Sequence, residues 1–235
     1  MYWEGRMPDY IALCCKTVLA HNQHVRLLDR GAFDELFMFD RDINIDAIAV
    51  QHKSDFISSY LLRYYGGIYV DPDCIVLHSL APILEMVEQA SFVGYREPQG
   101  SISCNFMAAK AGSVVITAYY KHACEHVRSG RSIEWGDLGA KSLEKAVAEY
   151  AGKYRLLPTE SIMPIAWYRS EELAIQRNDK EHERLLKRDA FCYMLSNNTV
   201  KGRAQTKILA TLSEEELLKG NYFMSFLFRR ALEAT

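Results

Sequence analysis

The 235-residue sequence lacks several features that would assign it to a particular class of protein. It has no excess of basic residues, because its net charge is −2, whereas a nucleic-acid-binding protein usually carries a basic face. No apolar run reaches the roughly 18 residues that a membrane-spanning helix needs. The opening residues, MYWEGRMPDY, contain neither the basic start nor the apolar core of a secretory signal peptide. We therefore expect no nucleic-acid partner and a cytoplasmic location.

The sequence also lacks a Cys-x-x-Cys pair, an internal repeat and a low-complexity linker. Its six cysteines lie within apolar patterns, which is typical of buried, reduced thiols in a cytosolic protein. With 49% hydrophobic and 25% charged residues, the chain has the composition of a globular protein. Its length suits one large domain. We expect a single domain over residues 1–235.

Apolar periodicity predicts helices and strands that alternate along the chain. The expected helices cover residues 9–22, 54–65, 113–127, 139–150, 170–188 and 214–235, and the expected strands cover residues 24–29, 67–70, 74–77, 91–97, 102–110 and 190–195. Such alternation indicates an α/β domain with a mixed, mostly parallel central sheet flanked by helices.

Two aspartates end one of these strands, in the segment YYGGIYVDPDCIVL. Asp71 and Asp73 are two residues apart, so in an extended chain they point to the same side. Pro72 restricts Asp71 to extended conformations and has no N–H for a sheet ladder. Both carboxylates therefore lie in the place where open α/β sheets bind ligands, beyond the carboxyl end of a strand.

A third carboxylate is expected to join this pair. If the helix begins at Ser54 or Asp55, it runs about 16 Å to Tyr65. After the turn at Gly66–Gly67, the strand returns about 13 Å by Asp71. If helix and strand pack antiparallel, Asp55 faces the two aspartates.

Clustered carboxylates repel each other unless a cation, a shared proton or a bound partner offsets the repulsion. Oxygen ligands without nearby His or Cys suit Mg²⁺ or Mn²⁺ better than Zn²⁺. The alternative is a pair of solvated aspartates in a turn.

The segment KSDFISSYLLRYYGGIYVDPD resembles the sugar-nucleotide-binding region of Asp-x-Asp glycosyltransferases. These include the capsular-polysaccharide and mannosyltransferase-like families and the glucosylating clostridial toxins. The shared pattern is Ser-Asp, about a dozen mostly helical residues, Gly-Gly-x-Tyr, one apolar residue and Asp-x-Asp. The resemblance implies a GT-A fold and transfer of a hexose from a nucleotide-diphosphate sugar, with retention, in bacterial surface polysaccharide synthesis.

The resemblance also implies roles for residues that would bind the donor, expected to be a UDP-hexose rather than a GDP-hexose. Asp71 would hold ribose and sugar hydroxyls, and Asp55 would bind sugar hydroxyls. Tyr69 would lie beside the donor, Trp3 against the base, and Asn105 near a sugar hydroxyl.

The metal, Mn²⁺ or Mg²⁺, would be bound directly by Asp73, with Asp71 contacting it too. Relatives often have a His and a Trp-Asn stretch near the end of the domain, where this chain has YMLSNNTVKGR. Asn197 could supply a neutral metal ligand there, and Lys201 and Arg203 could meet the phosphates. An ordinary polar loop is the alternative.

The chain departs from many relatives at Ser58, where they carry an Arg that helps to hold the donor. A hydroxyl cannot supply a guanidinium's charge. This departure keeps open a catalytically inactive, carbohydrate-binding relative. A Mg²⁺ phosphatase of the haloacid-dehalogenase type also has an Asp-x-Asp pair after an apolar strand and is the other alternative.

Two further partners are expected. The acceptor would be a saccharide or a lipid-linked saccharide. The C-terminal segment NYFMSFLFRRALEAT has apolar side chains nearly all round the predicted helix, more than one buried face requires. It could therefore contact another subunit or the inner face of the membrane.

Overall fold

The computed structural model of the protein describes residues 1–233, and the chain forms two compact units. Unit 1 contains Met1–Glu4, Arg26–Asp71 and Ala81–Leu157. Unit 2 contains Gly5–Val25, Pro72–Leu80 and the residues from Pro158 onward. The single domain over residues 1–235 stays a prediction.

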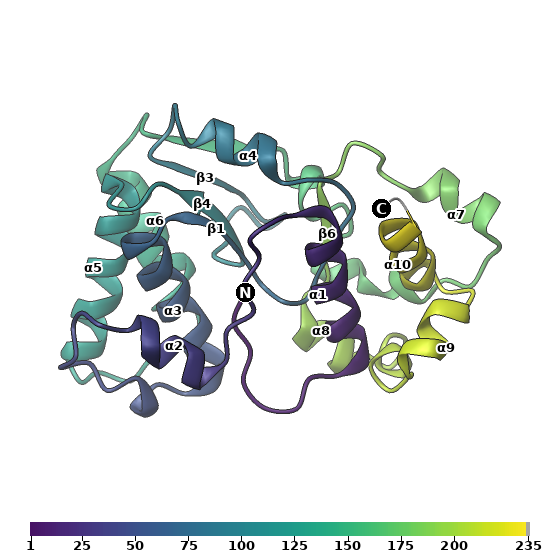
Figure 1. The fold of residues 1–235 in the computed structure, drawn as a ribbon, viewed down its shortest axis with the longest axis horizontal. Coiled ribbons are helices and arrows are strands. Elements are labelled where there is room, and N and C mark those ends of the chain that lie inside the picture. The colour runs from purple at the N-terminus through teal and green to yellow at the C-terminus, as the bar shows by residue number, and fades with distance from the viewer. Residues whose placement is uncertain (234–235) are drawn as a thin grey trace. The chain divides into compact units, whose positions relative to one another are not determined.

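Unit 1 combines helices with a four-stranded sheet (Figure 1). Its helices are α2 (Arg30–Leu36), the short 3-10 helix η1 (Ile45–Ala47), α3 (Val50–Tyr64), α4 (Ala81–Met86), α5 (Val114–Arg128) and α6 (Ala140–Glu149). Its strands are β1 (Gly67–Val70), β3 (Phe92–Tyr95), β4 (Phe106–Ala109) and β5 (Tyr154–Leu157).

The sheet of unit 1 has the strand order β1-β4-β3-β5. β4 is antiparallel to both β1 and β3, and only β3 and β5 are parallel. This arrangement confirms the α/β class with a mixed sheet flanked by helices, but the prediction that the sheet is mostly parallel was wrong. The reason is the short connection between β3 and β4, where Gly100, at φ +100°, lets the chain reverse directly.

The helices of unit 1 build its core in layers. α3 packs on β1, α5 packs on α3, and α6 packs on α5, while α4 packs against β4. β3 and β4 are buried along their whole length, as expected for strands covered on both faces. A cluster of aromatic and aliphatic side chains that includes Phe33, Phe56, Tyr60, Phe92 and Tyr119 fills the interior.

A glycine pair turns α3 into β1. Gly66 and Gly67 have φ values of +68° and +98°, which favour glycine. A Cβ at Gly66 would lie 2.5 Å from the backbone nitrogen of Ala111, so a side chain does not fit there. The turn therefore requires glycine, and it places β1 directly after α3 as the sequence predicts.

Unit 2 is mostly helical. Its helices are α1 (Asp9–His21), the 3-10 helices η2 (Thr159–Ser161), η3 (Trp167–Ala174) and η4 (Lys207–Ala210), and the α-helices α7 (Asp179–Leu185), α8 (Asn197–Gly202), α9 (Glu214–Lys219) and α10 (Phe223–Glu233). Its strands β2 (Cys74–Val76) and β6 (Cys192–Met194) pair antiparallel, with Cys74 opposite Met194.

The C-terminal segment forms two helices, which corrects the prediction of one helix over residues 214–235, whose last two residues lie outside the described part. α9 starts at a capping box formed by Ser213 and Glu216. Between α9 and α10, Tyr222 pairs with Gln176 in an isolated β-bridge, so the backbone there is extended.

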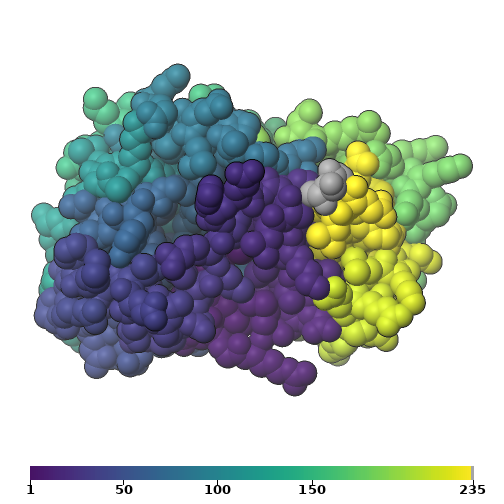
Figure 2. All heavy atoms as spheres, viewed as in Figure 1, coloured from purple at the N-terminus to yellow at the C-terminus, as the bar shows by residue number. Residues whose placement is uncertain are grey.

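The apolar side chains of α10 are buried within unit 2. In Figures 1 and 2, the yellow C-terminal helices lie beside the purple α1, with which both make contact. Phe223, Met224, Phe226, Leu227 and Phe228 are each at most 6% exposed. Internal packing therefore accounts for the unusually apolar helix. Within residues 1–233, no helix combines the length and the hydrophobicity required to cross a bilayer.

Two other predicted elements differ from the structure. The helix expected over residues 170–188 is divided into η3 and α7, because Gln176 is extended and Asn178 starts α7 with its own capping box. The strand expected over residues 24–29 contributes a single bridge, Tyr2 to Leu28.

Candidate active site

Helix α3 carries Asp55 in its second turn. The helix begins at Val50, so the prediction that Ser54 or Asp55 starts it was wrong. Ala49 stands at the N-cap position and offers no side-chain cap. Because Asp55 is not at the start of the helix, its carboxylate does not cap the helix and makes contacts outside it. Asp55 is partly buried.

The Asp55 carboxylate is enclosed by two residues that the sequence did not single out. The Cys104 thiol donates a hydrogen bond to Oδ1 of Asp55 over 3.1 Å. A Cβ on Gly139 would lie 2.5 Å from Oδ2 of Asp55, so the bare backbone of Gly139 is what leaves room for the carboxylate. Burial raises the pKa of Asp55 to about 6, and the hydrogen bond from Cys104 opposes that rise.

Asp71 and Tyr69 lie close to this carboxylate, at the end of β1. The Asp71 backbone N–H donates to the carbonyl of Asn105 over 2.8 Å. Burial raises the pKa of the Tyr69 hydroxyl well above its usual range, and the charges of Asp71 and then of Asp55 raise it further. Unit 1 therefore places the carboxylates of Asp55 and Asp71 close to the Tyr69 hydroxyl.

Asn105 and Trp3 have defined positions in the same unit. Oδ1 of Asn105 accepts a hydrogen bond from the Tyr95 hydroxyl over 2.9 Å, which fixes the carboxamide beside the end of β1. The Trp3 backbone N–H donates to the carbonyl of Leu28 over 2.9 Å. Beside Trp3, Glu4 forms an ion pair with Lys53 of α3 over 3.2 Å.

Ser58, which replaces the arginine of many relatives, is fully buried. Its hydroxyl donates to the carbonyl of Asp55 over 2.9 Å within the same helix. A buried hydroxyl committed to its own helix cannot bind a diphosphate.

In unit 2, Asp73 is buried and hydrogen-bonded. Its Oδ2 accepts from the backbone N–H of Asn197 over 2.6 Å, and the Asn197 side chain accepts from the Tyr10 hydroxyl. Burial raises the pKa of Asp73, while the hydrogen bond from Asn197 and the charge of Lys201 lower it. Asn197 and Lys201 therefore both lie near Asp73, whereas Tyr10 was not predicted as a site residue.

Arg203 is engaged elsewhere in unit 2. Its guanidinium donates to the carbonyl of Tyr168 over 2.7 Å and forms an ion pair with Glu171 over 2.8 Å. Of the two cations predicted to meet phosphates, Lys201 is the one whose charge acts on Asp73.

The donor atoms around the aspartates suit a hard divalent cation, because they are carboxylate and carboxamide oxygens. Among residues 1–233, no three His, Cys, Asp or Glu side chains converge to hold a metal on their own. An ion held by Asp73 would consequently need further oxygen ligands from water or from a bound diphosphate.

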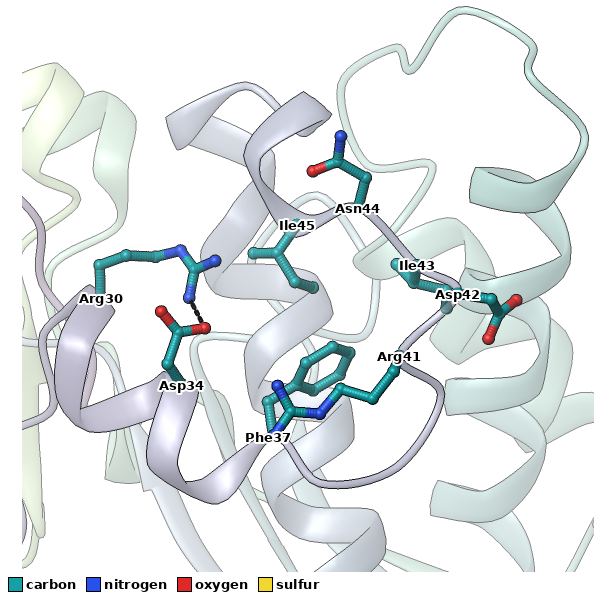
Figure 3. A pocket seen from close by; sticks show the side chains of 8 residues that line it. All are labelled: Arg30, Asp34, Phe37, Arg41, Asp42, Ile43, Asn44 and Ile45. Carbon is teal, nitrogen blue, oxygen red and sulfur yellow. Dashed lines mark hydrogen bonds and ion pairs between the residues drawn. The ribbon is translucent and has the colours of Figure 1, made fainter.

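Unit 1 also contains a pocket of about 280 Å³ at a different place (Figure 3). Its lining residues come from one stretch of chain and are Arg30, Asp34, Phe37, Arg41, Asp42, Ile43, Asn44 and Ile45. Arg30 is paired with Asp34 and Asp42 with Arg128, while the Arg41 guanidinium lies over the Phe37 ring, 5.8 Å from its centroid. None of the predicted site residues lines this pocket.

Comparison with known proteins gives a family for the segment that carries the aspartates. Residues 3–91 match the family described as "Glycosyltransferase sugar-binding region containing DXD motif". The match confirms the resemblance read from the sequence: this segment is related to the Asp-x-Asp glycosyltransferases. It supports sugar transfer as the general activity and a transferase as the class of enzyme.

A solved structure, "PaToxG Glycosyltransferase", is similar at 15% sequence identity and a TM-score of 0.48. The likeness covers 64% of this chain and 68% of that one. No curated protein matches the chain.

Proposed function

We propose that the protein transfers a hexose from a nucleotide-diphosphate sugar, most simply a UDP-hexose, to a saccharide or lipid-linked saccharide. The observation that carries the proposal is the convergence of Asp55, Tyr69 and Asp71 at the end of β1, within a segment that matches a DXD sugar-binding region. Carboxylates beside a buried phenol offer several hydrogen-bond acceptors to the hydroxyls of one sugar.

The proposal assigns the donor contacts that the resemblance implies. Asp55 accepts hydrogen bonds from sugar hydroxyls, which it does most strongly when it is ionised. Asp71 contacts sugar and ribose hydroxyls, and the Asn105 carboxamide lies beside it. Trp3 packs against the base. Tyr69 lies beside the donor, with its hydroxyl near both carboxylates.

A divalent cation, Mn²⁺ or Mg²⁺, is part of the proposal. Asp73 would hold it directly, Asp71 is two residues away in the chain, and Asn197 contributes from beside Asp73. When bound, the ion would stabilise the negative charge that grows on the leaving diphosphate. Lys201 adds positive charge near Asp73.

No described residue stands out as a protein nucleophile, and a retaining transfer that uses the leaving phosphate as base needs none. The carboxylates of this chain bind and orient the donor. The rate of transfer therefore depends on how the donor is positioned and on how well the charge of the leaving diphosphate is stabilised.

The proposal also includes a biological setting. A role in surface polysaccharide synthesis and a cytoplasmic location follow from the resemblance and from the cysteines, of which five are buried and Cys104 is half-buried. Contact with a membrane or a subunit through α10 gains no support from its buried apolar residues. Any such contact would have to use the exposed part of that helix.

A donor screen tests the proposal. Purified protein is mixed with Mn²⁺ and each of several UDP- and GDP-hexoses, and both the melting temperature and release of the nucleotide are measured. We expect one donor to raise the melting temperature in a Mn²⁺-dependent way and to be hydrolysed slowly, because a ligand that binds the native state stabilises it. If no nucleotide sugar stabilises the protein or is turned over, the proposed function is wrong.

A further inference from the structure

Trp135 is the large hydrophobic residue with the greatest exposure among residues 1–233, at 71%. It lies in the connection between α5 and α6, on a turn that is closed by hydrogen bonds. The Glu134 backbone N–H donates to Oδ2 of Asp137 over 2.7 Å, and the Asp137 N–H donates to the carbonyl of Glu134 over 3.1 Å. Lys141 in turn forms an ion pair with Asp137 over 2.8 Å. The Trp135 side chain is therefore exposed to solvent on a turn that hydrogen bonds close.

The same connection encloses Asp55. Four residues after Trp135, the backbone of Gly139 packs directly on the Asp55 carboxylate. The Trp135 ring makes an edge contact with His52, with 6.3 Å between ring centroids. His52 lies three residues before Asp55 on α3, and residues at this spacing share one face of a helix. Trp135 thus stands on the α3 face that carries Asp55.

Single exposed aromatic residues are common on protein surfaces and usually need no explanation. Trp135 differs in two respects, because hydrogen bonds close its turn and because that connection also contacts a candidate sugar-binding carboxylate. An indole presents a flat apolar face, and a sugar ring presents a face of C–H groups flanked by hydroxyls. The two surfaces match, and a neighbouring carboxylate can accept the hydroxyls.

We propose that Trp135 is a stacking platform for the acceptor saccharide, seated next to the donor sugar at Asp55. This inference rests on the proposed sugar transfer and adds to it the class of acceptor, a sugar ring with an exposed C–H face. An ordered platform lowers the entropy cost of binding, since the turn does not need to be fixed on association.

Direct binding tests the platform without any donor. Saturation-transfer NMR with maltose, lactose and mannobiose as probes should detect binding of at least one of them to the wild-type protein. Trp135→Ala should abolish that signal, and Trp167→Ala is the matched control because Trp167 is also exposed, at 37%, but lies in unit 2. Circular dichroism should show that both variants remain folded.

Kinetics provides the second readout. With a donor identified, Trp135→Ala should raise the acceptor KM by about tenfold, the size expected when one aromatic contact is lost. Trp135→Phe, which retains an aromatic ring, should recover part of the loss.

The outcomes separate the two proposals. If wild type hydrolyses no donor but binds a disaccharide through Trp135, the transferase proposal fails and the platform stands. If none of the three disaccharides binds, or if Trp135→Ala and Trp167→Ala bind equally, the platform is wrong. If Trp135→Ala changes the oligomeric state but still binds the saccharide, Trp135 contacts a second copy of the chain. That result would also overturn the inference.

Discussion

At the scale of single residues, the site combines side chains that the sequence identifies with contacts that it does not. Asp55, Tyr69 and Asp71 could be predicted because α3, the glycine turn and β1 are consecutive, so simple geometry places their ends together. Cys104 and Gly139 could not, because they reach Asp55 from distant parts of the chain. The signal that existed was indirect: Cys104 precedes the candidate residue Asn105 in the sequence.

The environment of Asp55 leads to a pH-dependent prediction. Because the pKa of Asp55 is raised to about 6, the folded protein holds this proton more tightly than the unfolded chain, where aspartate titrates near 3.9. The resulting stability is complete below about pH 4 and is lost as pH rises through about 6. Asp55→Asn removes this penalty, so it should unfold at higher urea concentration than wild type at pH 8.

The gain in the free energy of unfolding at pH 8 should be up to about 3 kcal/mol, and at pH 4 it should be small. Donor turnover should be lost at both values, since an amide cannot replace the charged acceptor. A stability difference that is the same at pH 4 and pH 8 would contradict the raised pKa of Asp55.

The two cations of the segment 197–203 should differ in function. Lys201 acts on Asp73, whereas Arg203 is held by Glu171 and the Tyr168 carbonyl. Lys201→Ala should raise the donor KM by about tenfold, equivalent to about 1.4 kcal/mol of binding. Arg203→Ala should leave the KM unchanged and lower stability by less than about 1 kcal/mol, as for other exposed ion pairs. The prediction fails if Arg203→Ala alone raises the KM.

At the scale of elements, the boundaries were harder to predict than the elements themselves. Ser54 and Asp55 are typical helix caps, yet α3 starts at Val50. Tertiary contacts explain the earlier start: His52 and Lys53 are buried, and Lys53 pairs with Glu4. A single sequence does not reveal such partners. The break between α9 and α10 was missed for the same reason, because it depends on pairing between Tyr222 and Gln176.

One buried hydroxyl joins α1 to β2, the strand that begins after Asp73. Thr17 is fully buried, and its Oγ1 accepts a hydrogen bond from the Val76 backbone N–H over 2.9 Å. Thr17→Val keeps the shape but leaves that buried N–H without a partner. The expected loss of unfolding free energy is about 1–3 kcal/mol.

Thr17→Ser is the matched control, because it retains the hydroxyl and should bind the Val76 N–H as before. Urea unfolding of the two variants and the wild type measures the difference. Equal stability of Thr17→Val and wild type would show that the hydrogen bond contributes nothing to the attachment of β2.

At the scale of the whole molecule, the α/β class followed from the alternation of helical and strand patterns, but the pairing of strands did not. Helices between strands suggested parallel neighbours. The chain instead turns back at Gly100, so that β4 runs antiparallel between β1 and β3. Strand order depends on such short connections and on which faces of the sheet are covered. The apolar periodicity of a single segment indicates neither.

The central claim is that the Asp-x-Asp pair binds a divalent cation together with a nucleotide sugar. Calorimetric titration of UDP in the presence of Mn²⁺, on wild type and Asp73→Asn, tests it most directly, with melting temperatures confirming that both are folded. The account predicts Mn²⁺-dependent UDP binding by wild type and its loss in Asp73→Asn, with no phosphorylated Asp71 in either protein. Equal UDP affinity in the two proteins, or binding that is indifferent to Mn²⁺, would contradict it.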